Sequence, residues 1–481
     1  MKNVSLSIGS LPSLSTSTLT SVPVSNLAST DYVGQPLVLN YDTFSYYIAS
    51  IIFASILLFL AKLYNNVRRQ PINITSASGP VADLVRSLPS LAGPGATFEP
   101  VWWLPSGDLQ TIFCSMGSFE NVDRIQYERK LIRVPDNGTL ALDFAASPNA
   151  TENSPIAVIL HGLTGGSHEH YIRALLTDLT SPTVGFRAVV VNARGCAGAP
   201  VTSPRLYHGG TTDDLRCALI YIRARFPSST LVGVGFSVGA NMLAKYLGEE
   251  GTASMLSAGV CLANVWDFAA GIEHMEQGGF MQRFVYNNVL GSAQQALYRS
   301  ASYALGSVAE RWRLTEVFGA PFCGMRWIDD RVASQMAGCK NAKEYYQRNS
   351  SSEFLSGVRV PLLGLNACDD PIAAKTIPYE AARASEHFVL ATTEGGGHLG
   401  WFTQQGGQLK RWYTRPVVEF LCASVAATTS SATTPATILG DDGMLKEAER
   451  PSIGCREISN SEIAAHVWSH ANATSLSNKG W

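Results

Sequence analysis

The stretch Leu231-Val-Gly-Val-Gly-Phe-Ser-Val-Gly-Ala240 decides the fold that we expect for this chain. It places Ser237 in a G-x-S-x-G motif between an apolar run typical of a buried strand and a run typical of a helix. A sharp strand-to-helix turn strains the serine backbone and brings segments close, so Gly235 and Gly239 supply positions without a Cβ atom. Such short motifs also arise by chance, and the surrounding sequence must support this one.

Strand-like and helix-like stretches alternate on both sides of the motif. The strand-like runs lie at 156–161, 186–192, 230–236, 258–263, 361–366 and 387–391. A hairpin signal, Pro135-Asp-Asn-Gly138, joins two further runs at 127–134 and 139–145. This alternation predicts an α/β fold with a mostly parallel sheet and helices on both faces. Ligands of such sheets bind at the carboxyl ends of the strands.

Residues 266–346 interrupt this alternation, because they contain many helix formers and no clear strand. We expect a helical cap inserted between two strands, where it would exclude water from Ser237 and supply an apolar pocket. An independent all-α domain is the alternative. The return to a strand at Pro361 favours the insertion.

A serine is a poor nucleophile without a base and an orienting acid. Asp370 follows one strand-like run, and His398 lies in a glycine-rich loop after the next run. The order Ser237, Asp370, His398 is the order found in α/β-hydrolases, so we predict that fold and this catalytic triad. Asp369 is the alternative acid, but Asp370 lies three residues after the strand-ending Ala367 and is preferred.

The oxyanion of an acyl-transfer intermediate needs two convergent backbone N–H groups, each contributing on the order of 3 kcal/mol in the transition state. Val238 follows the nucleophile and supplies one of them in this prediction. The loop His161–Ser167 follows an earlier strand-like run, and we assign the second donor to Leu163.

The spacing His208-Gly-Gly-Thr-Thr-Asp213 is of the H-x-x-x-x-D type linked to acyl transfer, which makes His208 and Asp213 candidates for an accessory role. A structural interpretation competes with it. Thr212 or Asp213 would cap a helix that begins near Leu215, and His208 would be a packing contact.

Residues 43–64 are predicted to form one transmembrane helix. The run from Thr43 to Ala61 carries no charge and is long enough to cross about 30 Å of hydrocarbon. A signal peptide is disfavoured because the run starts after forty residues, and a buried core helix is the other alternative. Lys62, Arg68 and Arg69 follow the run. They predict a single-pass protein with its catalytic domain on the cytosolic side of a membrane.

Several N-x-S/T sequons, among them those at Asn73, Asn137, Asn149 and Asn349, would be usable only in a lumen and oppose this topology.

The flanking regions differ in composition from the middle of the chain. Residues 1–40 and 424–481 are rich in small polar residues and are predicted to be disordered tails. Residues 65–96 contain two patches that resemble linkers. The catalytic domain is therefore expected to span 97–423.

Composition excludes several classes of protein. The chain has 481 residues, 46% of them hydrophobic, and a net charge of −2. Its sequence shows no Lys/Arg cluster with interleaved aromatic residues, so we expect no nucleic-acid partner. Nine scattered cysteines form no C-x-x-C pair. We predict a reduced compartment, no metal, no cofactor and no obligate protein partner.

A series of motifs, taken in order, resembles one family. The motifs are PSGDLQTI (105–112), HGLTGGS (161–167), NARGCAG (192–198), YHGGTTDDL (207–215), GFSVGAN (235–241), YY (345–346) and DDPI (369–372). They resemble the membrane-anchored α/β-hydrolases, which include fungal medium-chain fatty-acid ethyl ester synthase/esterases, mammalian phospholipases and lipases, and plant embryogenesis-associated proteins. Two departures are Asp108, where many relatives carry histidine, and an extra glycine before His398.

The resemblance implies ester or acyl-transfer chemistry on lipids beside a bilayer. Our leading hypothesis is a serine hydrolase that cleaves carboxylic esters of acyl lipids through an acyl-enzyme on Ser237. An alcohol O-acyltransferase that uses the same triad is the first alternative. A non-catalytic module that binds a lipid or a hormone in the cap pocket is the second.

Overall fold

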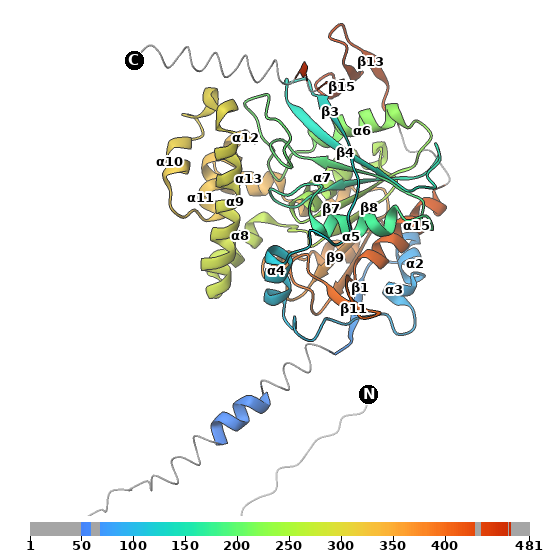
Figure 1. Cartoon of the computed structure of the whole chain (residues 1–481), viewed down its shortest axis with the longest axis vertical. Coiled ribbons are helices and arrows are strands. Elements are labelled where there is room, and N and C mark those ends of the chain that lie inside the picture. The colour runs from blue at the N-terminus through green and yellow to red at the C-terminus, as the bar shows by residue number, and fades with distance from the viewer. Residues whose placement is uncertain (1–49, 59–67, 429–433, 460, 463–481) are drawn as a thin grey trace, which may run out of the picture. The chain divides into compact units, whose positions relative to one another are not determined.

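The computed structural model describes residues 50–58, 68–428, 434–459 and 461–462. The chain divides into two compact units, Met1–Phe59 and Leu60–Trp481. The larger unit contains a sheet of 13 strands with helices packed against it (Figure 1).

Six adjacent strands of this sheet run parallel to one another. In spatial order they are β6 (Arg187–Asn192), β5 (Ile156–Leu160), β7 (Leu231–Phe236), β8 (Gly259–Leu262), β9 (Leu362–Ala367) and β10 (Phe388–Thr393). Every residue of β5, β7, β8, β9 and β10 is buried, because helices cover both faces of the sheet. The mostly parallel sheet predicted from the apolar runs is thereby confirmed.

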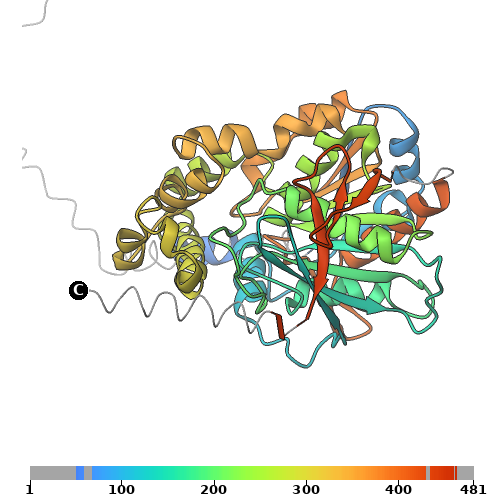
Figure 2. The same ribbon diagram turned by 90° about the horizontal axis from the view of Figure 1, so that it is seen from above.

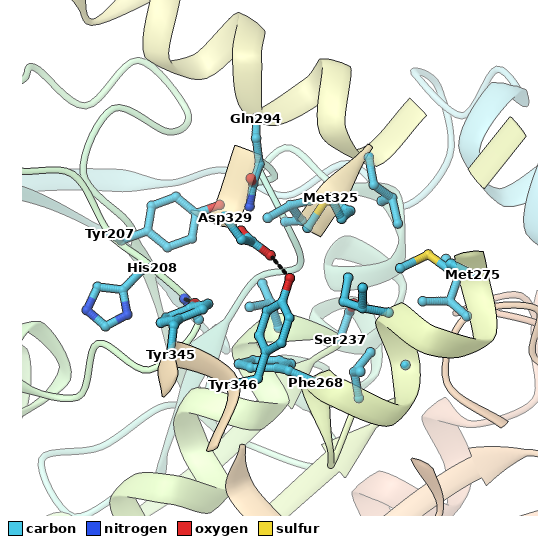
Figure 3. A pocket seen from close by; sticks show the side chains of 18 of the residues that line it. Tyr207, His208, Ser237, Phe268, Met275, Gln294, Met325, Asp329, Tyr345 and Tyr346 are labelled. Carbon is cyan, nitrogen blue, oxygen red and sulfur yellow. Dashed lines mark hydrogen bonds between the residues drawn. The ribbon is translucent and has the colours of Figure 1, made fainter. Parts of the chain in front are cut away.

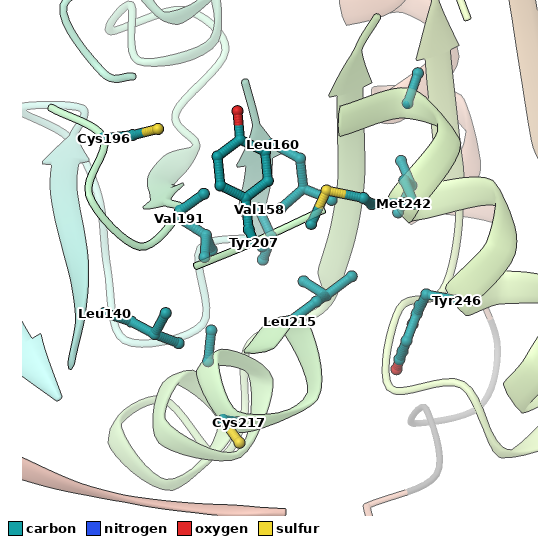
Figure 4. Packing of buried hydrophobic residues seen from close by; sticks show 14 of the residues in the cluster. Leu140, Val158, Leu160, Val191, Cys196, Tyr207, Leu215, Cys217, Met242 and Tyr246 are labelled. Carbon is teal, nitrogen blue, oxygen red and sulfur yellow. The ribbon is translucent and has the colours of Figure 1, made fainter. Parts of the chain in front are cut away.

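Each face of the sheet has its own hydrophobic cluster. On one face, α6 (Asp213–Arg225) and α7 (Val238–Glu250) pack their apolar side chains against β5 and β6. Figure 4 shows Leu215 of α6 and Met242 of α7 facing Val158 and Leu160 of β5. On the other face, α5 (His170–Leu179) and α15 (Thr414–Ala427) cover the alternate side chains of the same strands. The two clusters fix where the carboxyl ends of the strands lie.

Antiparallel strands extend the sheet at both edges. At the β6 edge lie β4 (Thr139–Ala146), β3 (Glu128–Arg133), β15 (Gly454–Ile458), β14 (Leu445–Glu447) and β13 (Thr437–Leu439). At the β10 edge lie β1 (Gln70–Thr75) and β2 (Thr97–Phe98). A separate hairpin joins β11 (Phe402–Gln405) to β12 (Gln408–Arg411).

The expected linker over 65–96 is corrected by these strands. β1 pairs with β10, and α2 (Pro80–Arg86) and α3 (Pro89–Ala92) follow it. Val85 and Leu91 of these helices are buried in the same cluster as α15. The catalytic unit therefore includes residues 70–96, since this segment buries apolar side chains as a linker does not.

The expected disordered tail over 424–481 is corrected for residues 437–458. These residues form β13, β14 and β15, and β15 pairs with β3 at the sheet edge. Ile453, Cys455 and Ile458 are buried there. Apolar burial against the sheet orders a segment whose composition indicated disorder.

The predicted transmembrane segment, 43–64, lies largely outside the described residues, which cover only a helical stretch at 50–58. No helix of the described part is long and apolar enough to cross a bilayer. The predicted tail at 1–40 lies outside the described residues altogether.

A helical insertion, which we call the cap, connects β8 to β9. Its helices are α8 (Phe268–Gln277), α9 (Asn287–Ser300), α10 (Leu314–Gly319), α11 (Met325–Ile328), α12 (Ser334–Met336) and α13 (Ala342–Asn349), with π-helical turns at Met281–Tyr286 and Asp329–Ala333. Figures 1 and 2 show these helices gathered at one end of the sheet. The cap was predicted over 266–346, and the structure contains it within a few residues of those bounds. Its Tyr286 hydroxyl donates a hydrogen bond to Asp108 of α4 (Gly107–Met116), 2.7 Å away, and so ties the cap to the body.

Candidate active site

Ser237 occupies the turn between β7 and α7, with φ 53° and ψ −119°. L-residues rarely adopt this conformation, which is typical of a nucleophile elbow. A Cβ atom on Gly239 would lie 2.5 Å from the His161 carbonyl oxygen, and one on Gly235 would lie 2.5 Å from the Cα of Ala240. Both glycines are therefore required by close approach of the backbone, as the motif predicts.

Two hydrogen bonds connect the three residues of the predicted triad. The Nε2 atom of His398 lies 2.8 Å from the Ser237 Oγ, and its Nδ1 lies 2.8 Å from an Asp370 carboxylate oxygen. Asp370 follows β9 and His398 follows β10, so the parallel sheet brings residues 161 positions apart to one edge. The His398 N–H donates to the Thr111 hydroxyl at 2.8 Å, which fixes its loop against α4.

The structure separates the two neighbouring acids. The second carboxylate oxygen of Asp370 accepts from the N–H groups of Ile372, at 2.8 Å, and Ala373, at 2.9 Å, which orients the group toward His398. Asp369 instead accepts from the N–H of Gly397 at 2.9 Å. Burial, together with the charge of Asp370, raises the pKa of Asp369 to about 7. Of the two acids, it is Asp370 that hydrogen-bonds to the imidazole.

The loop after β5 is held by buried hydrogen bonds. His161 accepts from the N–H of Ala193 at Nε2, 3.0 Å away, and its Nδ1 lies 2.7 Å from the Gly162 carbonyl oxygen. Burial lowers the pKa of His161 to about 4, so the ring is neutral at pH 7. Leu163 and Val238 both line the cavity that contains Ser237. The N–H of Val238 lies in the first turn of α7, where no intrahelical acceptor exists.

A cavity between the sheet edge and the cap contains Ser237 and His398 (Figure 3). Its apolar lining comes from Leu163, Val238, Val265, Phe268, Ile272, Met275, Leu290, Leu297, Met325 and Ile372. Most of these side chains belong to the cap, which accordingly shapes the space around the serine. An apolar lining of this kind favours an apolar part of a ligand.

The structure does not bring His208 and Asp213 together in the site. His208 lines the cavity, and burial together with Arg205 and Lys245 lowers the pKa of its ring to about 3. Asp213 starts α6, is 56% exposed at its side chain and pairs with Arg216 at 3.1 Å. The accessory role for Asp213 finds no geometric support, because its carboxylate is turned to solvent.

The next residue, Asp214, is the buried member of that motif. It pairs with the guanidinium of Arg194 at 2.7 Å, and Arg194 also contacts Asp136 at 2.7 Å. This ion pair joins α6 to the loop after β6. This ion pair was not predicted, although the motifs NARGCAG (192–198) and YHGGTTDDL (207–215) contain its two residues.

Two polar residues of the cavity were also not predicted. Asp329 and Gln294 come from the cap and line the cavity together with Ser237. They belong to no motif, and the only signal in the sequence is an acidic pair, Asp329 and Asp330, within a helical stretch. Within the described residues, no group of three or more His, Cys, Asp or Glu side chains is arranged to hold a metal ion.

Comparison with known proteins agrees with this geometry. Residues 155–404 match the model of the alpha/beta hydrolase fold family, which covers more than half of the chain. The chain belongs to this family.

Three named relatives are similar to this member of the alpha/beta hydrolases. Monoacylglycerol lipase of Saccharomyces cerevisiae is 32% identical over 372 aligned positions, and the match covers 69% of this chain and 82% of the relative. Medium-chain fatty acid ethyl ester synthase/esterase 2 of the same yeast is 28% identical and covers 68% of this chain and 85% of its own length. Phospholipase ABHD3 of Homo sapiens is 28% identical, with coverage of 68% and 79%.

Proposed function

We propose that this protein is a serine hydrolase that cleaves carboxylic ester bonds of acyl lipids through an acyl-enzyme on Ser237. The observation that carries the proposal is the hydrogen-bonded series from Ser237 through His398 to Asp370. A module that only binds lipid has no need of this series. The relatives named as lipases and esterases, together with the apolar cavity, support a lipid ester as the substrate.

The geometry supports the usual two-step acyl transfer. Ser237 Oγ bonds to the ester carbonyl carbon while its proton moves to His398 Nε2. Asp370 accepts from Nδ1–H, so it keeps the ring oriented and stabilises the imidazolium that forms. The imidazolium then gives its proton to the departing alcohol oxygen. Water, deprotonated by the same ring, cleaves the acyl-enzyme and releases the fatty acid.

The oxyanion of each tetrahedral intermediate is assigned to the N–H groups of Leu163 and Val238. Both residues line the cavity beside Ser237, and the N-terminus of α7 adds a favourable dipole. Two such donors typically lower the barrier by about 3 kcal/mol each. The hydrogen bonds at His161 hold the first donor loop in place before substrate binds.

Ester hydrolysis by matched variants tests this proposal. Wild-type protein is expected to hydrolyse ethyl esters of fatty acids, and Ser237→Ala is expected to lose this activity by several orders of magnitude. His398→Ala should lose as much, because the two residues act as one unit. Ser257→Ala, outside the cavity, is the matched control. Equal rates for wild type and Ser237→Ala would contradict the proposal.

Acyl transfer to an alcohol is a second candidate, favoured by the relative named as an ethyl ester synthase. The mostly apolar lining of the cavity also disfavours water as the acceptor. The same acyl-enzyme would then be cleaved by an alcohol rather than by water. Supplying ethanol with an acyl donor tests this candidate: it predicts ethyl ester formation faster than release of the fatty acid, and release alone would exclude it.

We further propose that residues 43–64 anchor the chain in a membrane with the catalytic unit on the cytosolic side. The support is the uncharged run from Thr43 to Ala61 and the basic residues that follow it. Carbonate extraction of the full chain should leave it in the membrane pellet, whereas a chain that starts at residue 65 should be released. Glycosylation at the sequon of Asn349 would contradict the cytosolic side.

A further inference from the structure

Helix α4 turns its apolar side chains toward solvent and its polar side chains toward the protein. Its buried residues are small or polar: Gly107, Gln110, Thr111 and Cys114. Its apolar residues have the spacing of one helix face and are exposed or half-buried: Leu109, Ile112, Phe113 and Met116. A helix at a protein surface ordinarily has the reverse arrangement.

Hydrogen bonds account for the polar residues on the buried face. The Gln110 side chain accepts from the Phe402 N–H at 2.8 Å, and the Thr111 hydroxyl accepts from the His398 N–H at 2.8 Å. These bonds hold the loop that carries the catalytic histidine. They explain why the buried face is polar, and they leave the exposure of the apolar face unexplained.

Two tryptophans in the turn before α4 extend its apolar face. Trp102 is 72% exposed, and the ring of Trp103 lies edge-on to Phe113 with 4.8 Å between the ring centroids. The turn and the helix thus form one surface, which we call the α4 patch: Trp102, Trp103, Leu109, Ile112, Phe113 and Met116.

The α4 patch contains no charge. Between Glu99 and Glu120 the sequence has one charged residue, Asp108, and its carboxylate accepts a hydrogen bond from Tyr286 of the cap. No charged side chain therefore opposes the transfer of the patch from water to an apolar medium. Exposed apolar patches of this kind mark sites of contact with a protein or with a membrane.

The membrane anchor proposed above joins the catalytic unit beside this patch. β1 begins at Gln70, six residues after position 64, and six residues reach at most about 21 Å. Gln70 lies opposite Phe98 in the β1–β2 pair, and Trp102 follows Phe98 by four residues. Figure 1 shows α4 and β1 at the end of the catalytic unit opposite to β13. So short a connection keeps this end of the unit toward the bilayer.

We propose that the α4 patch docks on the lipid bilayer, as a second membrane contact beside the anchor at 43–64. The inference rests on the proposed function, including the anchor. Tryptophan favours the boundary between hydrocarbon and water, where its ring is buried and its N–H stays hydrated. Docking brings the loop that carries His398 to the surface in which an acyl lipid lies.

Fluorescence of the full-length chain in lipid vesicles tests the docking. The vesicles are dioleoylphosphatidylcholine, with or without phosphatidylcholine that is brominated on its acyl chains and quenches tryptophan at contact range. Among the described residues, Trp102 and Trp103 are the tryptophans with exposed side chains. The variant Trp102→Phe/Trp103→Phe identifies their share of the emission.

A second variant, Leu109→Ser/Met116→Ser, makes the patch more polar and retains both tryptophans. The matched control is Ile438→Ser/Leu439→Ser, because these exposed residues of β13 lie at the opposite end of the sheet from β2. Thermal melting shows whether each variant folds.

Brominated lipid should quench the wild-type emission, and Trp102→Phe/Trp103→Phe should lose most of this quenching. Leu109→Ser/Met116→Ser should weaken the quenching, and the control should keep it. The same serine variant should hydrolyse ethyl oleate in the vesicles about tenfold more slowly, since two apolar side chains no longer favour the docked state. It should hydrolyse water-soluble ethyl butyrate at the wild-type rate.

The inference is overturned if the emission of Trp102 and Trp103 is insensitive to brominated lipid. Protection of that emission from aqueous acrylamide would then assign the patch to a second copy of the chain or to another protein. The quenching does not depend on catalysis, so loss of quenching with intact ester hydrolysis contradicts the docking alone. Intact quenching without hydrolysis of any ester would contradict the proposed activity and support the docking.

Discussion

The backbone of Ser237 has a positive φ of 53°. This conformation requires the backbone at Gly235 and Gly239 to approach other backbone segments closely. The strain is compensated by α7 and by the loop after β5, which pack within van der Waals contact of the turn. Gly235 and Gly239 must be glycine because a Cβ atom at either position would clash with backbone atoms.

Gly239→Ala is expected to lower the free energy of unfolding by about 1–3 kcal/mol and to reduce activity. The added methyl group would lie 2.5 Å from the His161 carbonyl oxygen, so either α7 or the loop His161–Ser167 must move. Urea unfolding measures the loss. Gly306→Ala is the control, because no atom lies within 4 Å of its Cβ position. Equal stability of both variants would contradict the packing of the elbow.

Asp370→Asn is expected to lower kcat roughly ten-thousandfold, since an amide no longer holds the imidazole in the reactive tautomer. Asp369→Asn should lower it by less than about tenfold, because Asp369 contacts Gly397 and not His398. Steady-state kinetics on one ester compare the two variants. The reverse order of effects would assign the acid to Asp369.

Asp329 makes stability depend on pH. Burial raises the pKa of its carboxyl from 3.8 to about 7, despite the Tyr346 hydroxyl and Arg326. Between these values the folded chain keeps a proton that the unfolded chain has lost, so stability falls as pH rises from about 4 to 7. Asp329→Asn removes the titrating group and therefore this fall in stability. Its melting temperature relative to wild type should therefore rise by a few degrees between pH 5 and pH 8.

The neighbouring Asp330→Asn serves as the control for this titration. Asp330 is exposed and accepts from the N–H of Ala342 at 3.0 Å, an interaction that asparagine retains. The change in melting temperature that it causes at each pH is the baseline against which the change caused by Asp329→Asn is compared. A difference between the two variants that stays constant with pH would show that Asp329 is not the buried group that titrates.

At the scale of elements, the sequence predicted the strands that can be recognised from their own run of apolar residues. The parallel strands are continuous apolar runs, because both of their faces are buried. The strands β13, β14 and β15 have no such pattern, since they are short and lie at a sheet edge. These strands are held in place by contacts with β3 and α6, which are distant in sequence. Composition alone therefore indicated a tail.

Ile453→Ala tests whether the C-terminal strands belong to the core. Ile453 is 3% exposed beside β15, so the substitution should lower the free energy of unfolding by about 2–5 kcal/mol. Ile438→Ala, in β13, removes a side chain that is 51% exposed and should change stability by less than about 0.5 kcal/mol. Urea unfolding measures the free energy of unfolding of both variants. If Ile453→Ala left the stability unchanged, the result would support the prediction of a disordered tail.

At the scale of the whole molecule, residues that the sequence placed at strand ends meet at one edge of the sheet. Ser237, Asp370 and His398 were predictable because parallel strands bring their carboxyl ends together. The polar part of the cavity was not predictable. Asp329 and Gln294 come from separate cap segments, and only the packing of the cap brings them beside the cavity.

Covalent labelling of Ser237 tests the central claim most directly. A fluorophosphonate reacts with a serine only where a base takes its proton and an oxyanion hole stabilises the product. Peptide mass spectrometry of the labelled wild-type chain should place one adduct on Ser237, with labelling strongly slowed in His398→Ala and lost in Ser237→Ala. An adduct on another residue, or equal labelling of Ser237→Ala, would contradict the acyl-enzyme mechanism.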